Sequence, residues 1–139
     1  MSNTKDLEQD IPINISDSQV ITILQTENVG VKEVKRLKSL TAATDKDISE
    51  WFEISEKTFQ TFRKTNTNLS LNFKEKLILY FSLYKQGMQV FGSNEKFNRW
   101  LDKPNFHFDN ERPQDFLTTI SGIRYVQDRI TGIAHGDNA

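Results

Sequence analysis

Hydrophobic residues recur every three or four positions along most of this chain, which is the spacing of one face of an α-helix. The pattern begins after Ser16 in SDSQVITILQTEN, a segment rich in β-branched residues and therefore the weakest helical pattern of the chain. It continues in VKEVKRLKSL, residues 31–40, where valines and leucines share one stripe and lysines lie opposite. Residues 1–16 are polar apart from the short alternation IPINI, and we expect them to form a mobile arm.

The longest periodic segment follows Ser70, a residue type that caps helices, and reaches Phe91. It contains LILYFSLY, so its apolar residues occupy several faces rather than one. A helix that is apolar on several faces is buried on several faces. We interpret residues 70–91 as a central core helix that joins two halves, with part of its apolar surface available for a dimer contact. Gly92 ends this helix as a C-cap residue.

The last third of the chain predicts three further helices. Ser93 caps SNEKFNRWL, which ends before Pro104 because the residue before a proline avoids the α region. Pro113 stands at the first position of the next helix, and Ser121 or Gly122 opens a last one that ends near Thr131-Gly132. The predicted fold class is all-α, a small helical bundle with short connections.

Residues 44–64 have the apolar spacing of a helix-turn-helix, with five apolar positions at Ile48, Phe52, Ile54, Phe59 and Phe62. The turn carries Glu53 where glycine is usual, and a left-handed backbone there costs about 1 kcal/mol. The outward face of the second helix carries side chains that suit phosphates and base edges. The candidate DNA contacts are Ser55, Lys57, Thr58, Gln60, Thr61, Arg63 and Lys64. The alternative is an ordinary helical hairpin with a solvated face, because Glu50, Glu53 and Glu56 weaken the local positive field.

Composition narrows the function classes. The 139 residues carry 18 lysines and arginines against 19 aspartates and glutamates, so any DNA binding depends on a local basic patch. The chain has no cysteine, which excludes disulfides and thiolate metal sites. It lacks a secretory signal pattern and an apolar segment long enough to span a bilayer, and we expect a soluble cytoplasmic protein that does not contact membranes.

The sequence carries no recognisable catalytic constellation. His107 and His135 have no partner at metal-ligand spacing and form no triad with serine and aspartate. No glycine-rich phosphate loop is present. We therefore expect a protein that is not an enzyme, with no catalytic residues, metal or cofactor.

A series of motifs in the second half resembles the toxin-binding domain of Xre/MbcA/ParS-type antitoxins, the partners of RES-domain toxins. The motifs are, in order, Phe91-Gly92, Arg99-Trp100-Leu101, Pro104-Asn105, Pro113 with Asp115 and Leu117, Gly122, and His135-Gly136. The resemblance spans residues 85–136, and the family's Xre-like helix-turn-helix falls where residues 44–64 lie. The chain departs from the family pattern at Phe106, Asp109-Asn110, Arg112, Gly132 and the tail Asp137-Asn138-Ala139.

The resemblance implies three regions: a mobile arm at 1–16, an Xre-like helix-turn-helix and dimerisation region at 17–69, and a central helix with the toxin-binding domain and tail at 70–139. It implies an antitoxin that neutralises a RES-domain toxin, an NAD-consuming enzyme similar to ADP-ribosyltransferases. It also implies a homodimer that binds operator DNA and represses its own operon. The alternative is a protein-interaction module that binds no DNA, in which the helix-turn-helix serves only dimerisation.

By the same resemblance, the C-terminal end of the chain covers the mouth of the toxin's NAD pocket. Glycines would let its backbone lie close to a concave surface. The candidate toxin contacts are Arg99, Asn105, Arg112, Arg129, Gly132, His135, Gly136 and Asp137. The alternative is a frayed C-terminal segment with an exposed histidine. We interpret Trp100 as a core residue, whereas Arg99 is either a toxin contact or a support for the loop that begins at Asn105.

Overall fold

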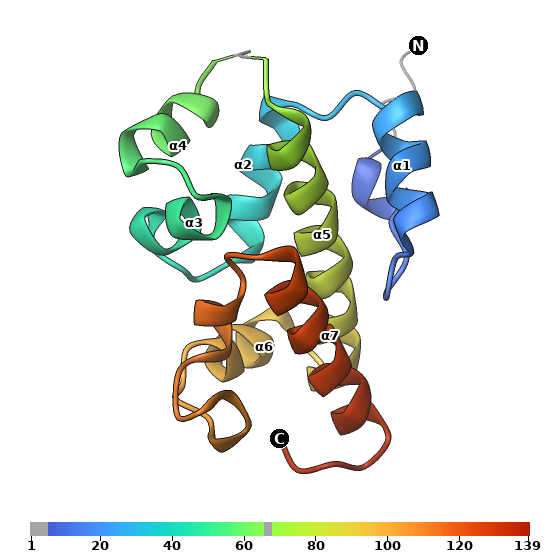
Figure 1. The fold of residues 1–139 in the computed structure, drawn as a ribbon, viewed down its shortest axis with the longest axis vertical. Coiled ribbons are helices and arrows are strands. Elements are labelled where there is room, and N and C mark those ends of the chain that lie inside the picture. Colours follow the sequence, from blue (N-terminus) through green and yellow to red (C-terminus); the bar gives the residue numbers. More distant parts are fainter. Residues whose placement is uncertain (1–5, 66–67) are drawn as a thin grey trace.

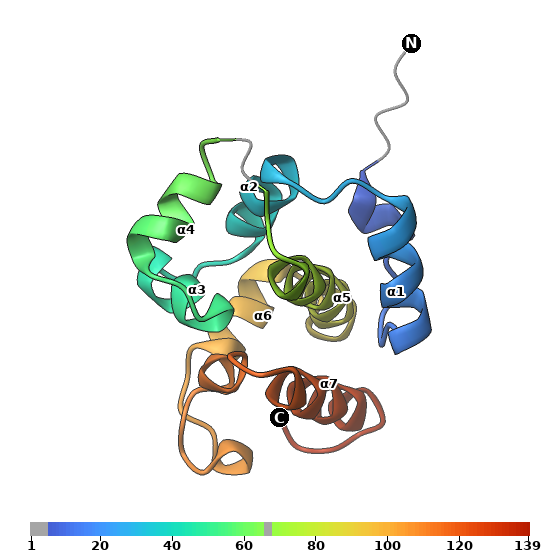
Figure 2. The same cartoon turned by 45° about the horizontal axis from the view of Figure 1, so that its top comes forward.

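The segment after Ser70 forms α5 (Leu71–Phe91), around which the other helices are arranged (Figures 1 and 2). The computed structural model describes residues 6–65 and 68–139; the first five residues of the expected arm and part of the polar turn at residues 65–68 lie outside this range. Leu77, Ile78, Leu79 and Tyr80 are four consecutive residues of α5 with at most 1% exposure. Because consecutive helical residues point in different directions, α5 is covered on all sides there, as predicted.

The described residues form helices and no strand, which confirms the all-α prediction. The first half contains a 3₁₀-helix at Leu7–Asp10, then α1 (Asp17–Thr26), α2 (Val31–Leu40), α3 (Asp45–Phe52) and α4 (Glu56–Phe62). After α5 come α6 (Asn94–Leu101), 3₁₀-helices at Phe106–Phe108 and Pro113–Phe116, and α7 (Ile120–Ala134). The helices α1, α2, α6 and α7 each pack against α5, while α3 and α4 pack against each other. None of the described helices is both long and apolar enough to cross a membrane.

Serine caps fix the helix starts that the sequence predicts. The hydroxyls of Ser16, Ser70 and Ser93 each accept a hydrogen bond from a backbone N–H three residues later. Each such cap stabilises its helix by about 1 kcal/mol. Gly92 ends α5 with φ +92°, the left-handed conformation that glycine adopts without strain.

The segment expected to be a mobile arm is instead packed against α5 over its described part, residues 6–16. Ile11 and Ile15 are completely buried. The backbone N–H of Ile15 donates to Ser82 Oγ at 3.2 Å, Ser82 Oγ donates to the Pro12 carbonyl at 2.7 Å, and Lys85 Nζ donates to the Ile11 carbonyl at 2.7 Å. The alternation in IPINI therefore places its first and last isoleucines in the core.

The last helix is longer than predicted at both ends. Thr119 caps it, accepting a hydrogen bond from Gly122 N at 2.9 Å, so α7 begins at Ile120 rather than at Ser121 or Gly122. It continues through Gly132, where the sequence predicted its end, and stops at Ala134. The helix expected at Pro113 is a single 3₁₀ turn.

Candidate DNA-binding and toxin-binding surfaces

The helices α3 and α4 form a tight helical pair around a left-handed turn. Glu53 adopts φ 58° and ψ 42°, the left-handed conformation expected for this turn position. Ile54 N then donates to the Ser49 carbonyl at 3.0 Å, which closes the turn at the end of α3. Phe52 and Phe59 are at most 2% exposed, so the apolar spacing of residues 44–64 predicts the packed side of this pair correctly.

Only part of the predicted DNA-contacting set is free to reach a ligand. Ser55 accepts a hydrogen bond from Thr58 N at 3.0 Å, and its hydroxyl donates to Thr58 Oγ1 at 2.8 Å, so both residues serve the start of α4. Lys57, Thr61 and Lys64 are exposed. Three exposed glutamates lie on the same helical pair and reduce the positive potential around the two lysines: Glu50, Glu53 and Glu56.

Asp45 holds two further members of the predicted set. Arg63 NH1 lies 3.0 Å from both carboxylate oxygens of Asp45, and Gln60 Nε2 lies 3.5 Å from one of them. Lys38 Nζ pairs with the same carboxylate at 3.1 Å. Burial alone would raise the pKa of Asp45, but the hydrogen bond and charge of Lys38 and the charge of Arg63 together hold it below its usual value. Arg63 and Gln60 therefore brace α4 against the start of α3.

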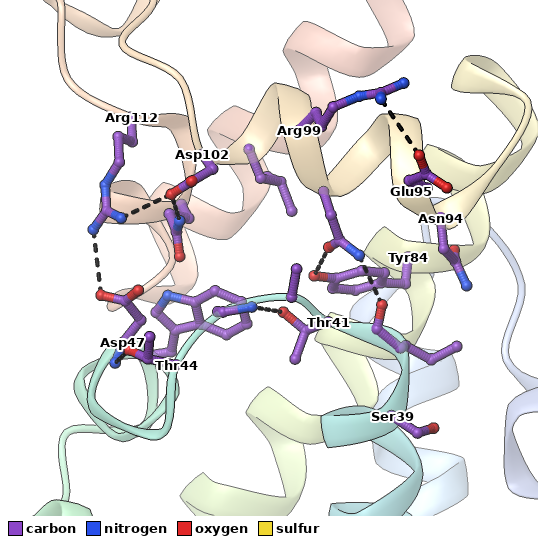
Figure 3. Close-up of a pocket in the computed structure, with 17 residues that line it drawn as sticks. Ser39, Thr41, Thr44, Asp47, Tyr84, Asn94, Glu95, Arg99, Asp102 and Arg112 are labelled. Atoms are coloured by element: carbon purple, nitrogen blue, oxygen red, sulfur yellow. Dashed lines mark hydrogen bonds and ion pairs between the residues drawn. The ribbon is translucent and has the colours of Figure 1, made fainter.

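Arg112 forms a three-way clamp between the two halves of the chain. Its guanidinium pairs with Asp47 of α3 at 3.3 Å, with Asp102 at the end of α6 at 3.0 Å, and with Asp115 at 2.7 Å. Figure 3 shows Arg112 reaching toward Asp47 and Asp102. The hydrogen bonds, that to Asp115 most of all, raise the pKa of Arg112. This predicted toxin contact is thus occupied by internal partners.

A cleft of 610 Å³ lies beside this clamp, between the loop after α2 and helix α6 (Figure 3). Arg99 is on its α6 side, 59% exposed and paired with Glu95 at 3.4 Å, so its guanidinium is accessible. Tyr84 donates to Asn98 Oδ1 at 2.7 Å, and Asn98 Nδ2 donates to the Leu40 carbonyl at 2.9 Å. These bonds fasten α6 to α5 and α2 at the edge of the cleft.

The loop between α6 and Pro113 is organised by Asn105. Its side-chain oxygen accepts a hydrogen bond from His107 N at 2.9 Å, and its main-chain carbonyl accepts hydrogen bonds from Phe108 N and Asn110 N at 2.9 Å each. The backbone N–H of Asn105 donates to the main-chain carbonyl of Glu111 at 3.0 Å. Asp109 and Asn110 adopt positive φ angles of 55° and 64°, as residues that tolerate the left-handed region do. We name residues 105–111 the Asn105 loop.

The C-terminal candidates gather at the end of α7. Gly136 has φ +105°, Asp137 N donates to the Gly132 carbonyl at 3.0 Å, and Gly136 N donates to the Ile133 carbonyl at 3.0 Å. This is the Schellman pattern that ends helices at a left-handed glycine. Gly136 therefore ends the helix, Gly132 lies within it beneath the Asp137 carboxylate, and His135 is exposed.

The tail then turns back toward the Asn105 loop. Arg129 lies 3.9 Å from the Asp137 carboxylate and donates to the Asn138 carbonyl at 3.4 Å. Trp100 Nε1 and Asn105 Nδ2 donate to the Ala139 main-chain oxygen at 3.2 and 2.9 Å. Arg99 and Arg112 lie at the cleft. The structure brings the other predicted toxin contacts together at one end of the molecule: Asn105, Arg129, Gly132, His135, Gly136 and Asp137.

The sequence predictions did not select Phe106, the most exposed large hydrophobic residue of the described chain at 83%. The only signal for it was its departure from the family pattern after the loop asparagine. Tyr125 of α7, 41% exposed, was also missed.

Comparison with known families identifies this end of the molecule. Residues 86–136 match the antitoxin Xre/MbcA/ParS C-terminal toxin-binding domain. The chain carries the toxin-binding domain of an Xre/MbcA/ParS antitoxin. No curated protein matches the chain. The matched toxin-binding domain begins within α5, includes α6, the Asn105 loop and α7, and ends at Gly136, just after α7.

Proposed function

We propose that this antitoxin neutralises a RES-domain toxin, an NAD-handling enzyme of the ADP-ribosyltransferase kind, by covering its active site with the C-terminal domain. The observation that carries the proposal is the match of residues 86–136 to a toxin-binding domain. The RES identity of the partner rests on the sequence resemblance of the same region. The inhibition is steric, because NAD cannot enter a pocket whose mouth is filled by another protein.

The state of the tail supports a preformed inhibitory surface. The Schellman turn at Gly136 and the hydrogen bonds of Trp100 and Asn105 to Ala139 hold residues 136–139 against the domain. A segment that is already ordered loses less conformational entropy when it binds a partner. We infer that the tail and the Asn105 loop meet the toxin as one surface.

The test uses a purified RES-domain toxin, the partner that this proposal names, with NAD consumption as the readout. A variant that lacks residues 138–139 and carries Asp137→Ala removes the tail contacts but keeps the backbone of the Schellman turn. We expect this variant to need a higher concentration than the unaltered chain for half-inhibition. Equal inhibition by both proteins would show that the tail takes no part in occlusion.

Operator binding by a homodimer is a second candidate function. The observation that favours it is the helix-turn-helix geometry, with a left-handed Glu53, a Ser55 cap, an exposed Lys57 on α4 and an exposed Lys64 just after the end of α4. The occupied state of Arg63 and Gln60 favours the alternative, in which the helical pair is only a scaffold for dimerisation. Each phosphate contact steepens the dependence of log K on log[salt] by roughly 0.9.

The salt dependence of binding to the upstream DNA region separates these two functions. If Lys57 and Lys64 contact one phosphate each, a dimer makes four phosphate contacts, and the slope of log K against log[salt] is roughly −4. The double variant that carries Lys57→Ala and Lys64→Ala is expected to bring this slope close to zero. Toxin inhibition by the same double variant is expected to stay unchanged, because both lysines lie outside the matched domain. A double variant that binds this DNA as tightly as the unaltered chain would refute the assignment of α4 as the recognition helix.

A further inference from the structure

The Asn105 loop exposes a large aromatic side chain. Phe106 is 83% exposed, more than the other exposed hydrophobic residues of the described chain, Leu71 at 68% and Ile21 at 54%. Among the described residues, its ring neighbour is the imidazole of His107, with the ring centroids 5.7 Å apart. Water therefore surrounds most of an apolar side chain whose burial would be favourable.

The backbone on both sides of Phe106 is fixed. Asn105 makes the hydrogen bonds that close the loop, and the carbonyl of His107 accepts a hydrogen bond from Tyr125 Oη at 2.7 Å. Phe108 is 1% exposed, and its ring contacts those of Trp100, Phe116 and Tyr125 at centroid distances of 5.7, 5.0 and 5.3 Å. The loop cannot fold Phe106 into the core without breaking these contacts.

A rigid loop that holds an exposed aromatic residue has the physical properties of a binding hot spot. Such residues fill a pocket of the partner, and a preformed loop avoids most of the entropy cost of ordering. Phe106 lies inside the matched toxin-binding domain, and Asn105 beside it bonds to Ala139, so the aromatic side chain and the tail belong to one continuous surface. Exposed Asp109 and Glu111 in the same loop complement a basic rim.

We propose that Phe106 is the anchor of the toxin interface and inserts into an apolar pocket of the toxin that is sized for an aromatic ring and bordered by basic side chains. The inference rests on the proposed neutralisation of a toxin and names the residue that determines its affinity. The tail covers the active site, whereas Phe106 holds the two proteins together.

The experiment measures toxin affinity by isothermal titration calorimetry for the full chain and three variants. Phe106→Ala is expected to weaken binding by about 30-fold or more, as the loss of a hot-spot residue does. Phe106→Leu keeps an apolar side chain and is expected to retain most of the affinity. The matched control Leu71→Ala removes another exposed apolar side chain outside the matched domain and is expected to bind like the unaltered chain.

Thermal melts separate folding from binding. Phe106→Ala is expected to melt at the same temperature as the unaltered chain, because its side chain contacts little of the protein. Affinity of Phe106→Ala within threefold of the unaltered chain would overturn the anchor while leaving toxin neutralisation intact. An unaltered chain that does not bind the toxin would overturn the proposed function itself.

Discussion

Replacing Arg112 with alanine is expected to destabilise the protein while leaving toxin binding nearly unchanged. Arg112 pairs with Asp47, Asp102 and Asp115, and its side chain is 31% exposed. An exposed ion pair stabilises a protein by about 0.2–1 kcal/mol, and three pairs with one partly buried guanidinium give a loss of about 1–3 kcal/mol. The loss includes the repulsion among three carboxylates that no longer share a cation.

Urea and thermal denaturation of Arg112→Ala measure this loss. A change of 1 kcal/mol corresponds to a shift of about 4 °C in Tm for a chain of this size. The matched control Arg99→Ala removes an exposed guanidinium that pairs with Glu95 alone among the described residues, and is expected to change stability by less than about 0.5 kcal/mol. A double-mutant cycle with Asp47→Ala isolates the part of the clamp that joins α3 to the toxin-binding domain.

The result that would refute this reasoning is an Arg112→Ala variant that melts with the unaltered chain and loses more than about tenfold in toxin affinity. Arg112 would then be a toxin contact, as the sequence predicted, and its three ion pairs would contribute nothing measurable.

Two further substitutions test the packing and the electrostatics by chemical denaturation. A Cβ at Gly87 meets the buried ring of Phe97, so we expect Gly87→Ala to be destabilised, because overpacking of about 1–3 kcal/mol outweighs the helix-propensity gain of about 1 kcal/mol. In the control Gly132→Ala, the atoms nearest to the new Cβ belong to the exposed side chain of Asp137, which can move aside. We therefore expect this control to be at least as stable as the unaltered chain. Equal stability losses for the two glycine variants would contradict this packing. Folding lowers the pKa of Asp45 from 3.8, so its contribution to the free energy of unfolding is present above pH 3.8 and is lost as the pH falls further. We therefore expect Asp45→Asn to be less stable than the unaltered chain at pH 6 and to lose less stability on acidification. Parallel stability curves for Asp45→Asn and the unaltered chain between pH 6 and pH 2.5 would show that Asp45 does not contribute.

Features set by neighbouring residues could be predicted from the sequence. The hydroxyl caps at Ser16, Ser70 and Ser93 act over three residues, and a left-handed Glu53 follows from the number of residues between two apolar stripes. The predicted end of α7 was wrong because the sequence offers two glycines, Gly132 and Gly136, either of which can end a helix. Gly136 ends the helix, since its left-handed backbone lets two orphan carbonyls of the last turn find donors.

Pairings between distant residues could not be predicted. Asp47 and Arg112 are 65 positions apart, and the periodicity of each helix says nothing about the angle at which α3 meets the second half. The same limit applies to Ile11 and Ile15, whose five-residue alternation is too short to distinguish a mobile arm from a packed one. The exposure of Phe106 depends on how Asn105 closes its loop, which the order of residues alone does not indicate.

Titrating the NAD consumption of a purified RES-domain toxin, the proposed partner, with this protein tests the central claim most directly. Steric occlusion predicts that activity falls linearly to zero as the antitoxin approaches its binding stoichiometry, and that the purified complex no longer binds NAD. A stable complex that consumes NAD at the rate of the free toxin would contradict occlusion of the active site.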